Sequence, residues 1–129
     1  MFLVPVRLDR SEIHGFGVFA AEHIPAGTRV WEFTEGVDYR ISAEEVHGAP
    51  EPWRGELLKY AYRDSSGDYI LCGDAARFMN HSEQPSCDDS GDLYTVAIAD
   101  IAPGVELTCD YRTFDLDFEH YAEHLDGKK

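Results

Sequence analysis

Short segments in which apolar and polar residues alternate follow one another along the chain, and this period of two predicts β-strands. The first covers residues 2–8, and further strands are expected at 17–20, 28–33, 69–72, 93–99 and 105–109. Turn sequences separate them, as in Ile24-Pro25-Ala26-Gly27 and Ile101-Ala102-Pro103-Gly104. In such turns Pro fixes φ and Gly accepts a positive φ. The pattern therefore predicts a mostly β chain of short strands.

Helical spacing occurs in two places. Ser42-Ala43-Glu44-Glu45 has the spacing of a capping box, so a short helix should begin at Ser42 and end before Gly48. A second helix is expected at 115–125, where helical spacing relates Phe114, Phe118, Tyr121 and Leu125. Such an aromatic stripe packs into a core more often than it covers a ligand. Residues 56–62 fit a helix or a strand equally well.

The length of 129 residues indicates one domain, and no linker or low-complexity stretch divides it. Residues 18–27 and 96–104 echo each other: each reads as a strand, an acidic corner and a Pro/Gly turn. This echo predicts two similar hairpin-like units within one mostly β domain. The three cysteines, Cys72, Cys87 and Cys109, are odd in number and widely spaced, which argues against a disulfide framework or a zinc ribbon.

Acidic residues outnumber basic ones by 25 to 11, which gives a net charge of −14. This charge disfavours nucleic acid as a direct ligand, because phosphate binding needs clustered Lys and Arg. It attracts cationic partners, although solubility alone would also account for it. No apolar run approaches the roughly 20 residues that cross a bilayer, and residues 1–6 are too short for a signal-peptide core. We therefore expect an intracellular, cytoplasmic protein without a membrane segment.

Three motifs follow one another in the chain: Gly15-Phe16-Gly17-Val18-Phe19-Ala20, Arg77-Phe78-Met79-Asn80-His81-Ser82-Glu83-Gln84-Pro85 and Glu106-Leu107-Thr108-Cys109-Asp110-Tyr111. Taken singly, each has an ordinary structural explanation. Two nearby glycines suit a bulge or a turn, an Asn-His pair suits a capped turn, and a tyrosine suits a core with its hydroxyl bonded. Their joint order and spacing is the more specific signal.

Together these motifs resemble the signatures of the SET-domain protein lysine methyltransferases, and the resemblance spans roughly Phe16 to Tyr111. It implies a mostly β, β-clip-like SET fold of small curved sheets with a knot-like C-terminal segment, one short internal helix and a C-terminal helix. It also implies a minimal, stand-alone SET domain over 1–129, in which 42–68 is a variable insert and 112–129 a C-terminal closing segment.

The resemblance also implies an activity, which is protein-lysine N-methylation with S-adenosylmethionine as the methyl donor and S-adenosylhomocysteine as the product. Tyr111 would be the catalytic residue, with its hydroxyl orienting the methyl group and the incoming amine. Cofactor binding falls on His14, Gly15, Phe16, Gly17, Arg77, Phe78, Asn80, His81, Tyr111 and Phe114. The substrate channel falls on Tyr69, Cys109, Tyr111 and Phe118.

Methyl transfer to an amine is an in-line displacement at a sulfonium methyl, and it has defined physical requirements. The amine must arrive neutral, although a free lysine has a pKa near ~10.4. Desolvation in a narrow aromatic channel and the neighbouring sulfonium charge both lower that pKa, and positioning supplies much of the acceleration. The reaction needs no metal and no nucleophilic side chain, so we expect no metal.

The chain departs from the family pattern at three positions. Cys109 stands where the family usually has Tyr or Phe, a position that influences the number of methyl groups added, so mono-, di- and trimethylation all stay open. Glu83 follows Asn80-His81-Ser82 where many members have a zinc-binding Cys, and no cysteine follows Cys109. We therefore expect no zinc and no cysteine-rich segment after the domain. Ser86 replaces the usual Asn after Pro85.

Two other functions fit parts of the sequence. His120-Tyr121-Ala122-Glu123-His124 has the His-x-x-Glu-His pattern of a zinc peptidase helix, but such a site needs a third protein ligand, and Asp126 is the one acidic residue downstream. The second alternative is a non-catalytic SET-like binding module. Retention of Asn80 and Tyr111 argues against it, whereas Cys109 and Ser86 keep it open.

The acidic charge makes a basic target protein plausible, such as a histone-like, nucleoid or ribosomal protein with an exposed lysine. Four glutamates of the 42–68 insert would be placed to meet target lysines or arginines: Glu44, Glu45, Glu51 and Glu56. A minimal SET domain without flanking segments also leaves room for a homodimer that completes the peptide groove.

Overall fold

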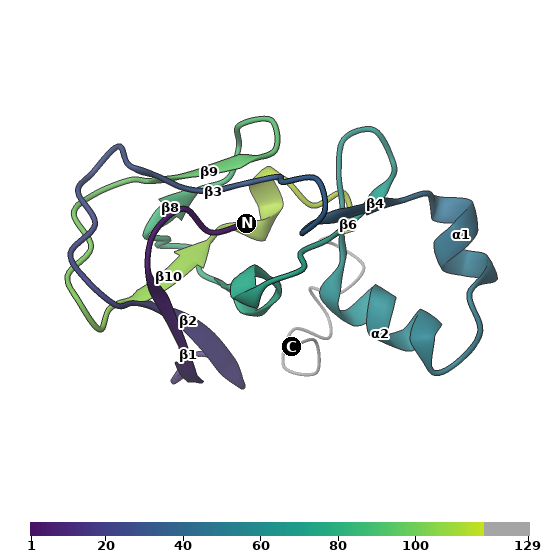
Figure 1. The fold of residues 1–129 in the computed structure, drawn as a ribbon, viewed down its shortest axis with the longest axis horizontal. Helices are drawn as coiled ribbons and strands as arrows, with labels where there is room; N and C mark the ends of the chain where they lie inside the picture. Colours follow the sequence, from purple (N-terminus) through teal and green to yellow (C-terminus); the bar gives the residue numbers. More distant parts are fainter. Residues whose placement is uncertain (118–129) are drawn as a thin grey trace.

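The computed structural model describes residues 1–117, which form three small sheets and two α-helices. The strand orders are β1-β2-β10-β7, β3-β9-β8 and β4-β6-β5 (Figure 1). The predicted mostly β class is confirmed. The strands are β1 Val6–Arg10, β2 Phe16–Ala20, β3 Arg29–Glu32, β4 Tyr39–Ile41, β5 Tyr62–Arg63, β6 Tyr69–Leu71, β7 Asn80–His81, β8 Cys87–Asp88, β9 Tyr94–Ala97 and β10 Glu106–Cys109.

The first sheet brings the three sequence motifs side by side. β1 pairs antiparallel with β2, from Val6 opposite Ala20 to Arg10 opposite Phe16. β10 pairs with the other edge of β2. The two-residue strand β7 then runs parallel to β10, with Asn80 opposite Thr108. Segments almost a hundred residues apart in the chain therefore meet in one sheet.

The two echoing segments pair with each other. Ile24 and Ile101 exchange both backbone hydrogen bonds, at 2.9 and 2.8 Å, and both side chains are buried. In each segment the turn glycine, Gly27 or Gly104, has a φ of 84°, which glycine adopts without strain. The Gly27 N–H donates to a carbonyl of the other unit, and so does Gly104. The echo therefore places two matching turns against each other.

Two internal α-helices are present, so the prediction of one is wrong. The first, α1 (Ala43–Gly48), begins after Ser42, whose hydroxyl accepts the Glu45 N–H at 3.1 Å, as the capping box predicts. The second, α2 (Trp53–Tyr60), follows Pro52 without a side-chain cap. Its sequence lacks a start signal, and its one buried residue packs against α1 rather than repeating along a stripe. Both helices lie at one end of the molecule, beyond β4 and β6 (Figure 1).

Buried side chains form two cores. The larger core joins the first two sheets and includes Val18, Val30, Leu107 and Tyr111. The smaller one joins the α-helices to β6 and consists of Val46, Leu57, Ala61, Tyr69 and Leu71. All three cysteines are free and buried, as expected for small apolar side chains.

The C-terminal part of the described chain contains no α-helix. A 3-10 turn, η2, covers Tyr111–Thr113, and residues 114–117 continue mainly as turn. The rest of the helix predicted at 115–125 lies outside the described residues. Over residues 1–117 we find no helix that combines the length and apolar character required to cross a membrane.

Candidate active site

Asn80 holds the Gly15–Gly17 segment, which we call the glycine segment, in place. Its side chain is 3 % exposed, and its amide nitrogen lies 3.0 Å from the His14 carbonyl oxygen and 3.1 Å from the Phe16 carbonyl oxygen. The same nitrogen lies 2.9 Å from Glu106 Oε2. One buried amide thus ties the segment between β1 and β2 to β10.

Gly17 is required by close approach rather than by backbone conformation. A Cβ built on Gly17 would lie 2.3 Å from Glu106 Oε2, well inside van der Waals contact. The other oxygen of that carboxylate accepts a hydrogen bond from the Ser11 hydroxyl at 2.7 Å. Any side chain at Gly17 would therefore displace the carboxylate that Asn80 and Ser11 share. Gly15 differs, because its φ of 49° is the left-handed conformation that favours glycine.

His81 binds the backbone at the start of η2. Its Nδ1 accepts the Tyr111 backbone N–H at 3.1 Å, so the imidazole is neutral with its proton on Nε2. Burial lowers the pKa of His81, and the nearby Asp110 carboxylate opposes this only in part. Asp110 is itself bound by Arg112 at 2.6 Å. A neutral His81 is thus built into the geometry.

Tyr111 is almost fully buried, and its hydroxyl donates to the Met79 carbonyl. Burial raises the pKa of this phenol well above its ordinary value, and the nearby Cys109 and Asp115 add to the effect. The hydroxyl therefore keeps its proton at neutral pH and remains a hydrogen-bond donor with two acceptor lone pairs.

Aromatic rings surround Tyr111 on two sides. Its ring centroid lies 5.7 Å from that of Phe114, which lies 5.0 Å from Tyr62 at a near-perpendicular angle. A second group joins Phe78 to Tyr60 at 5.5 Å and to the half-exposed Phe16 at 6.4 Å. Such edge-to-face contacts fix ring orientation. They give the region stiff walls.

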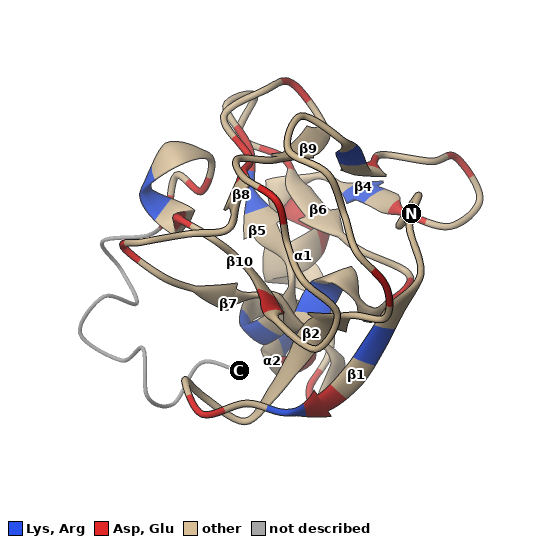
Figure 2. Ribbon diagram, turned by 90° about the vertical axis from the view of Figure 1, so that its left-hand side faces the viewer, with Lys and Arg blue, Asp and Glu red and all other residues tan. Residues whose placement is uncertain are grey.

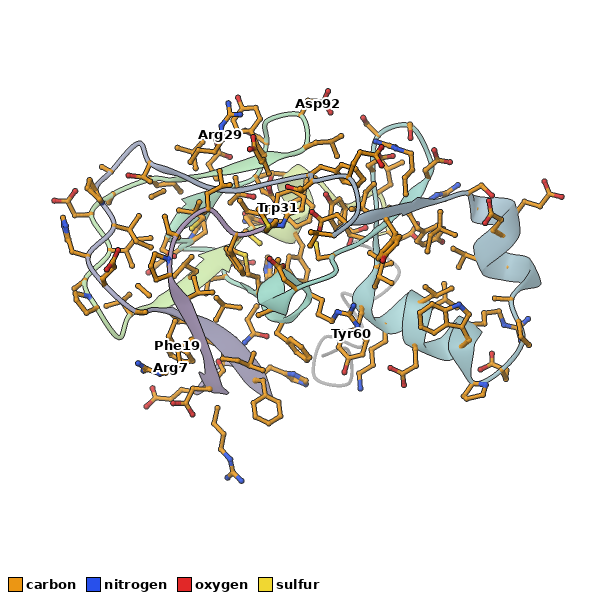
Figure 3. The ribbon with its side chains drawn as sticks, viewed as in Figure 1. Arg7, Phe19, Arg29, Trp31, Tyr60 and Asp92 are labelled. Atoms are coloured by element: carbon orange, nitrogen blue, oxygen red, sulfur yellow. The ribbon has the colours of Figure 1, made fainter. Side chains whose placement is uncertain are left out.

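A cavity lies between these groups, and we call it the inner cavity. Its wall combines Trp31 with Tyr60, Tyr62, Tyr111 and Phe114, of which Trp31 and Tyr60 are drawn in Figure 3. The polar part of the wall consists of Arg77, Asp89, Thr95 and Asp115. The remaining lining residues are Cys72, Ala76, Met79 and Cys109. The lining of the inner cavity, largely aromatic with a few polar groups, resembles that of ligand sites, and its volume of about 30 Å³ has room for one or two water molecules.

A second hollow, the outer cavity, shares Tyr62, Asp89 and Phe114 with the inner one. Its other lining residues belong to two loops and η2: Asp64, Ser65, Ser90, Gly91, Asp92, Leu93 and Thr113. Among residues 1–117, three carboxylates line it and no Lys or Arg does, and one of the three, Asp64, is paired with Arg40 at 2.7 Å. A cationic group would therefore meet favourable potential there.

The predicted site residues fall into four groups. Arg77, Cys109, Tyr111 and Phe114 line the inner cavity, while the Gly15–Gly17 segment, Asn80 and His81 are joined to it through hydrogen bonds and β7. Tyr69 lies elsewhere, in the smaller core, where its hydroxyl donates to Asp117 at 3.1 Å. Phe118, His120 and His124 lie outside the described residues.

Sequence reasoning missed several wall residues: Trp31, Tyr60, Tyr62, Asp89 and Thr95. Tyr60 and Tyr62 belong to the segment 56–62, which fits a helix or a strand equally well, so spacing alone does not single them out. Trp31, Asp89 and Thr95 belong to no motif. Within residues 1–117, no three His, Cys, Asp or Glu side chains gather where they could hold a metal ion, and the expectation of no metal stays a prediction.

The sequence profile of the SET domain matches residues 15–112. Among curated proteins, a "Histone-lysine N-methyltransferase, H3 lysine-4 specific" from Chaetomium globosum is 32 % identical over 118 residues, covering 84 % of this chain. Human "Histone-lysine N-methyltransferase 2B" is 32 % identical over 117 residues, covering 83 %. The chain spans 11 % and 4 % of the length of these two relatives.

Solved structures agree in fold. In the Polycomb Repressive Complex 2 of Chaetomium thermophilum, in an autoinhibited conformation bound to S-adenosylmethionine, one chain superposes with a TM-score of 0.64 and 25 % identity. The match covers 93 % of this chain and 17 % of that one.

Proposed function

This chain belongs to the SET-domain family, and we propose that it is an S-adenosylmethionine-dependent protein-lysine N-methyltransferase. One observation carries the proposal. The buried Asn80 amide binds the glycine segment and β10, and β10 leads directly to Tyr111 on the wall of the inner cavity. Two of the three motifs therefore contribute to the wall of one aromatic cavity, and the glycine motif is hydrogen-bonded to the second of them through Asn80.

The residues fit the cofactor. Its carboxylate calls for a cation, and Arg77 lies on the cavity wall, with its guanidinium 6.0 Å from the Tyr60 ring centroid. Its adenine calls for an apolar or aromatic surface, and the Phe16, Phe78 and Tyr60 rings lie in contact beside Arg77. Gly15 and Gly17 remove side chains where the backbone would approach the ligand. When bound, the cofactor supplies an electrophilic methyl group.

The chain's own residues would do the rest by positioning and desolvation. The Tyr111 hydroxyl is fixed by its hydrogen bond to the Met79 carbonyl. The lone pairs of the hydroxyl oxygen therefore point in a defined direction. The walls formed by Tyr60, Tyr62 and Phe114 would exclude water from an entering lysine side chain. Dehydration of this kind lowers the pKa of an amine and favours the neutral nucleophile. We assign Tyr111 the catalytic role and Cys109 a place beside the methyl-accepting nitrogen.

For the substrate we propose a basic protein such as a histone, because the two relatives are named as histone-lysine N-methyltransferases. The acidic residues spread over the loops and strands of the molecule support this (Figure 2). Methylation of a basic peptide should then fall steeply as salt is added, because exposed charges are screened. An intracellular, cytoplasmic location, the absence of a metal and a homodimer belong to the same proposal.

Calorimetric titration with S-adenosylmethionine tests the cofactor assignment. The wild type should bind one equivalent, and Asn80→Ala should abolish binding because the glycine segment loses its anchor. Gln84→Ala is the matched control, since it truncates an exposed amide in the same motif. Binding that survives in Asn80→Ala would contradict the assignment. Absence of binding in the wild type would favour the non-catalytic module.

A further inference from the structure

Asp89 occupies a special place between the two cavities. It lies in the loop between β8 and β9, partly buried, and it lines both the inner and the outer cavity. Its Oδ1 accepts a hydrogen bond from the Thr95 hydroxyl, and Thr95 is buried on β9 opposite Trp31. The carboxylate is therefore held by the second sheet rather than carried on a free loop tip.

The charge of Asp89 reaches the aromatic wall. Burial raises the pKa of Tyr62, and the nearby Cys72 and Asp89 raise it further. Asp89 acts in the same direction on Tyr111, although burial, Cys109 and Asp115 come first there. A negative charge close to both phenols would stabilise a cation placed between them.

The other charged residues of the inner cavity have structural duties. Asp115 Oδ1 accepts the backbone N–H groups of Arg63 and Asp117, at 3.3 and 3.0 Å, which fixes the turn after η2. The Arg77 Nε donates to the Cys72 carbonyl at 3.1 Å. Asp89 differs from both because it lines the outer cavity as well as the inner one.

Trp31 supplies an independent sign that the inner cavity receives a polar group. It lines the cavity and is 3 % exposed, and its indole N–H has no acceptor among residues 1–117. A buried donor without an acceptor costs free energy. A water molecule that enters the inner cavity with the lysine side chain would supply such an acceptor.

On the basis of the proposed methyltransferase function, we propose that Asp89 is a specificity-determining residue that binds the ε-ammonium of the target lysine. Ammonium–carboxylate hydrogen bonds are among the strongest that proteins form. The aromatic walls would contact the aliphatic stem, while Asp89 distinguishes lysine from an apolar side chain of equal length. The outer cavity, with Asp64 and Asp92 on its wall, would give the ammonium an acidic route to this carboxylate.

The position of Asp89 also gives the lysine proton a way out. In this step one N–H bond of the ammonium breaks, its electron pair stays on nitrogen, and an O–H bond forms on the Asp89 carboxylate. The acid then passes the proton to water in the outer cavity, which restores the carboxylate. The Asp89 carboxylate by itself favours the ammonium form, so the desolvating walls and the sulfonium charge must outweigh it before the neutral amine is left beside Tyr111.

The test follows two indole resonances by NMR in the isotope-labelled chain, with and without S-adenosylhomocysteine. Trp31 reports the inner cavity, and Trp53 on α2, which is not on its wall, serves as the internal control. The probes are N-acetyl-lysine N-methylamide and its norleucine analogue, which has the same aliphatic stem but no ammonium. The lysine probe should shift the Trp31 resonance at a concentration about ten-fold lower than norleucine, as a charged hydrogen bond predicts.

Asp89→Asn should erase this discrimination, because the amide keeps an oxygen for the Thr95 hydroxyl but carries no charge. Asp92→Asn should preserve it, since Asp92 is exposed at the tip of the β8–β9 loop and lines the outer cavity (Figure 3). An unchanged Trp53 resonance in both variants reports an intact fold. Equal affinity for the two probes in the wild type, discrimination retained in Asp89→Asn, or a Trp31 resonance that neither probe moves would overturn the assignment.

Calorimetry with S-adenosylmethionine on the same samples separates this inference from the proposed function. Cofactor binding without lysine discrimination contradicts the role of Asp89 alone. Lysine discrimination without cofactor binding contradicts the methyltransferase proposal while supporting the lysine site.

Discussion

The segment anchored by Asn80 and the cavity wall around Asp89 are built in different ways. Around Asn80 one buried amide nitrogen lies 2.9–3.1 Å from two backbone carbonyl oxygens and a carboxylate oxygen, so its two N–H groups are shared among three acceptors. Around Asp89 the wall is assembled from aromatic side chains of β3, α2 and β5 that touch mainly through their rings. Hydrogen-bond networks fail when one member is removed, whereas aromatic walls tolerate conservative exchange. A single substitution should therefore lower the free energy of unfolding strongly in the segment anchored by Asn80 and only weakly in the cavity wall.

The largest effect should come from Asn80→Ala. Removal of the amide leaves the His14 and Phe16 carbonyls and the Glu106 carboxylate without this donor in a part-buried setting. We expect the free energy of unfolding to fall by about 3 kcal/mol, measured by urea denaturation. Gln84→Ala should change it by less than about 0.5 kcal/mol, as is usual for surface sites. A loss for Asn80→Ala no greater than that of its control would remove the distinction between the two regions.

Gly17→Ala should be next in size. The new methyl group would meet the Glu106 carboxylate at 2.3 Å, and the carboxylate would have to leave Ser11 or Asn80. We expect a loss of about 1–3 kcal/mol in unfolding free energy, typical of overpacking at a close contact. Gly48→Ala provides the control, because nothing lies within 4 Å of its added Cβ. It should be neutral or slightly stabilising, and an equal loss at both glycines would contradict the close-contact account.

His81 should make the anchored region sensitive to acid. Its pKa is lowered in the folded protein, chiefly by burial, so the unfolded chain binds a proton more readily. The stabilising contribution of neutral His81 is therefore present above the unfolded pKa of about 6.5 and is lost as pH falls below it. Urea titrations between neutral and mildly acidic pH should show a smaller loss in His81→Gln than in the wild type. Identical pH profiles would show that the Tyr111 N–H does not depend on a neutral imidazole.

Tyr62→Phe should have the smallest effect on stability. It tests the cavity wall, as the earlier substitutions test the segment anchored by Asn80. Its ring contact with Phe114 is kept, and no hydrogen bond to its hydroxyl is seen within residues 1–117. The unfolding free energy should change by no more than about 0.5 kcal/mol. A loss of unfolding free energy as large as that of Gly17→Ala would mean that the cavity wall is as sensitive to substitution as the anchored segment.

The same contrast explains which parts of the molecule the sequence predicts. The capping box at Ser42 and the three motifs depend on local spacing, so α1 and the residues of the anchored segment could be located in advance. The second helix has no side-chain cap, and its start is invisible in the sequence. Sequence patterns therefore predicted the structure correctly where the stabilising interactions join residues that are close in the chain.

The cavity wall could not be located in this way, because it depends on pairing between distant segments. Tyr69 was predicted for the substrate channel; it lies in the smaller core, whereas Tyr62 lines the inner cavity. In the pairing of β5 with β6, Arg63 lies opposite Tyr69 and Tyr62 lies opposite Ile70. Neighbouring residues of a strand point to opposite faces, so the two tyrosines are on opposite sides of the sheet. Only the register, which spacing along the chain does not reveal, determines which one reaches the cavity.

The most direct measurement of the central claim is mass spectrometry of core histones after incubation with the purified chain and S-adenosylmethionine. Wild type should add whole methyl groups to lysine, and their number reports the influence of Cys109. Tyr111→Phe should lower the rate by about 100-fold, because the amine and methyl group lose their orienting hydroxyl, while circular dichroism confirms the fold. Lysine methylation that proceeds at the wild-type rate in Tyr111→Phe would contradict the account, and so would unmodified histones in the presence of a wild type that binds S-adenosylmethionine.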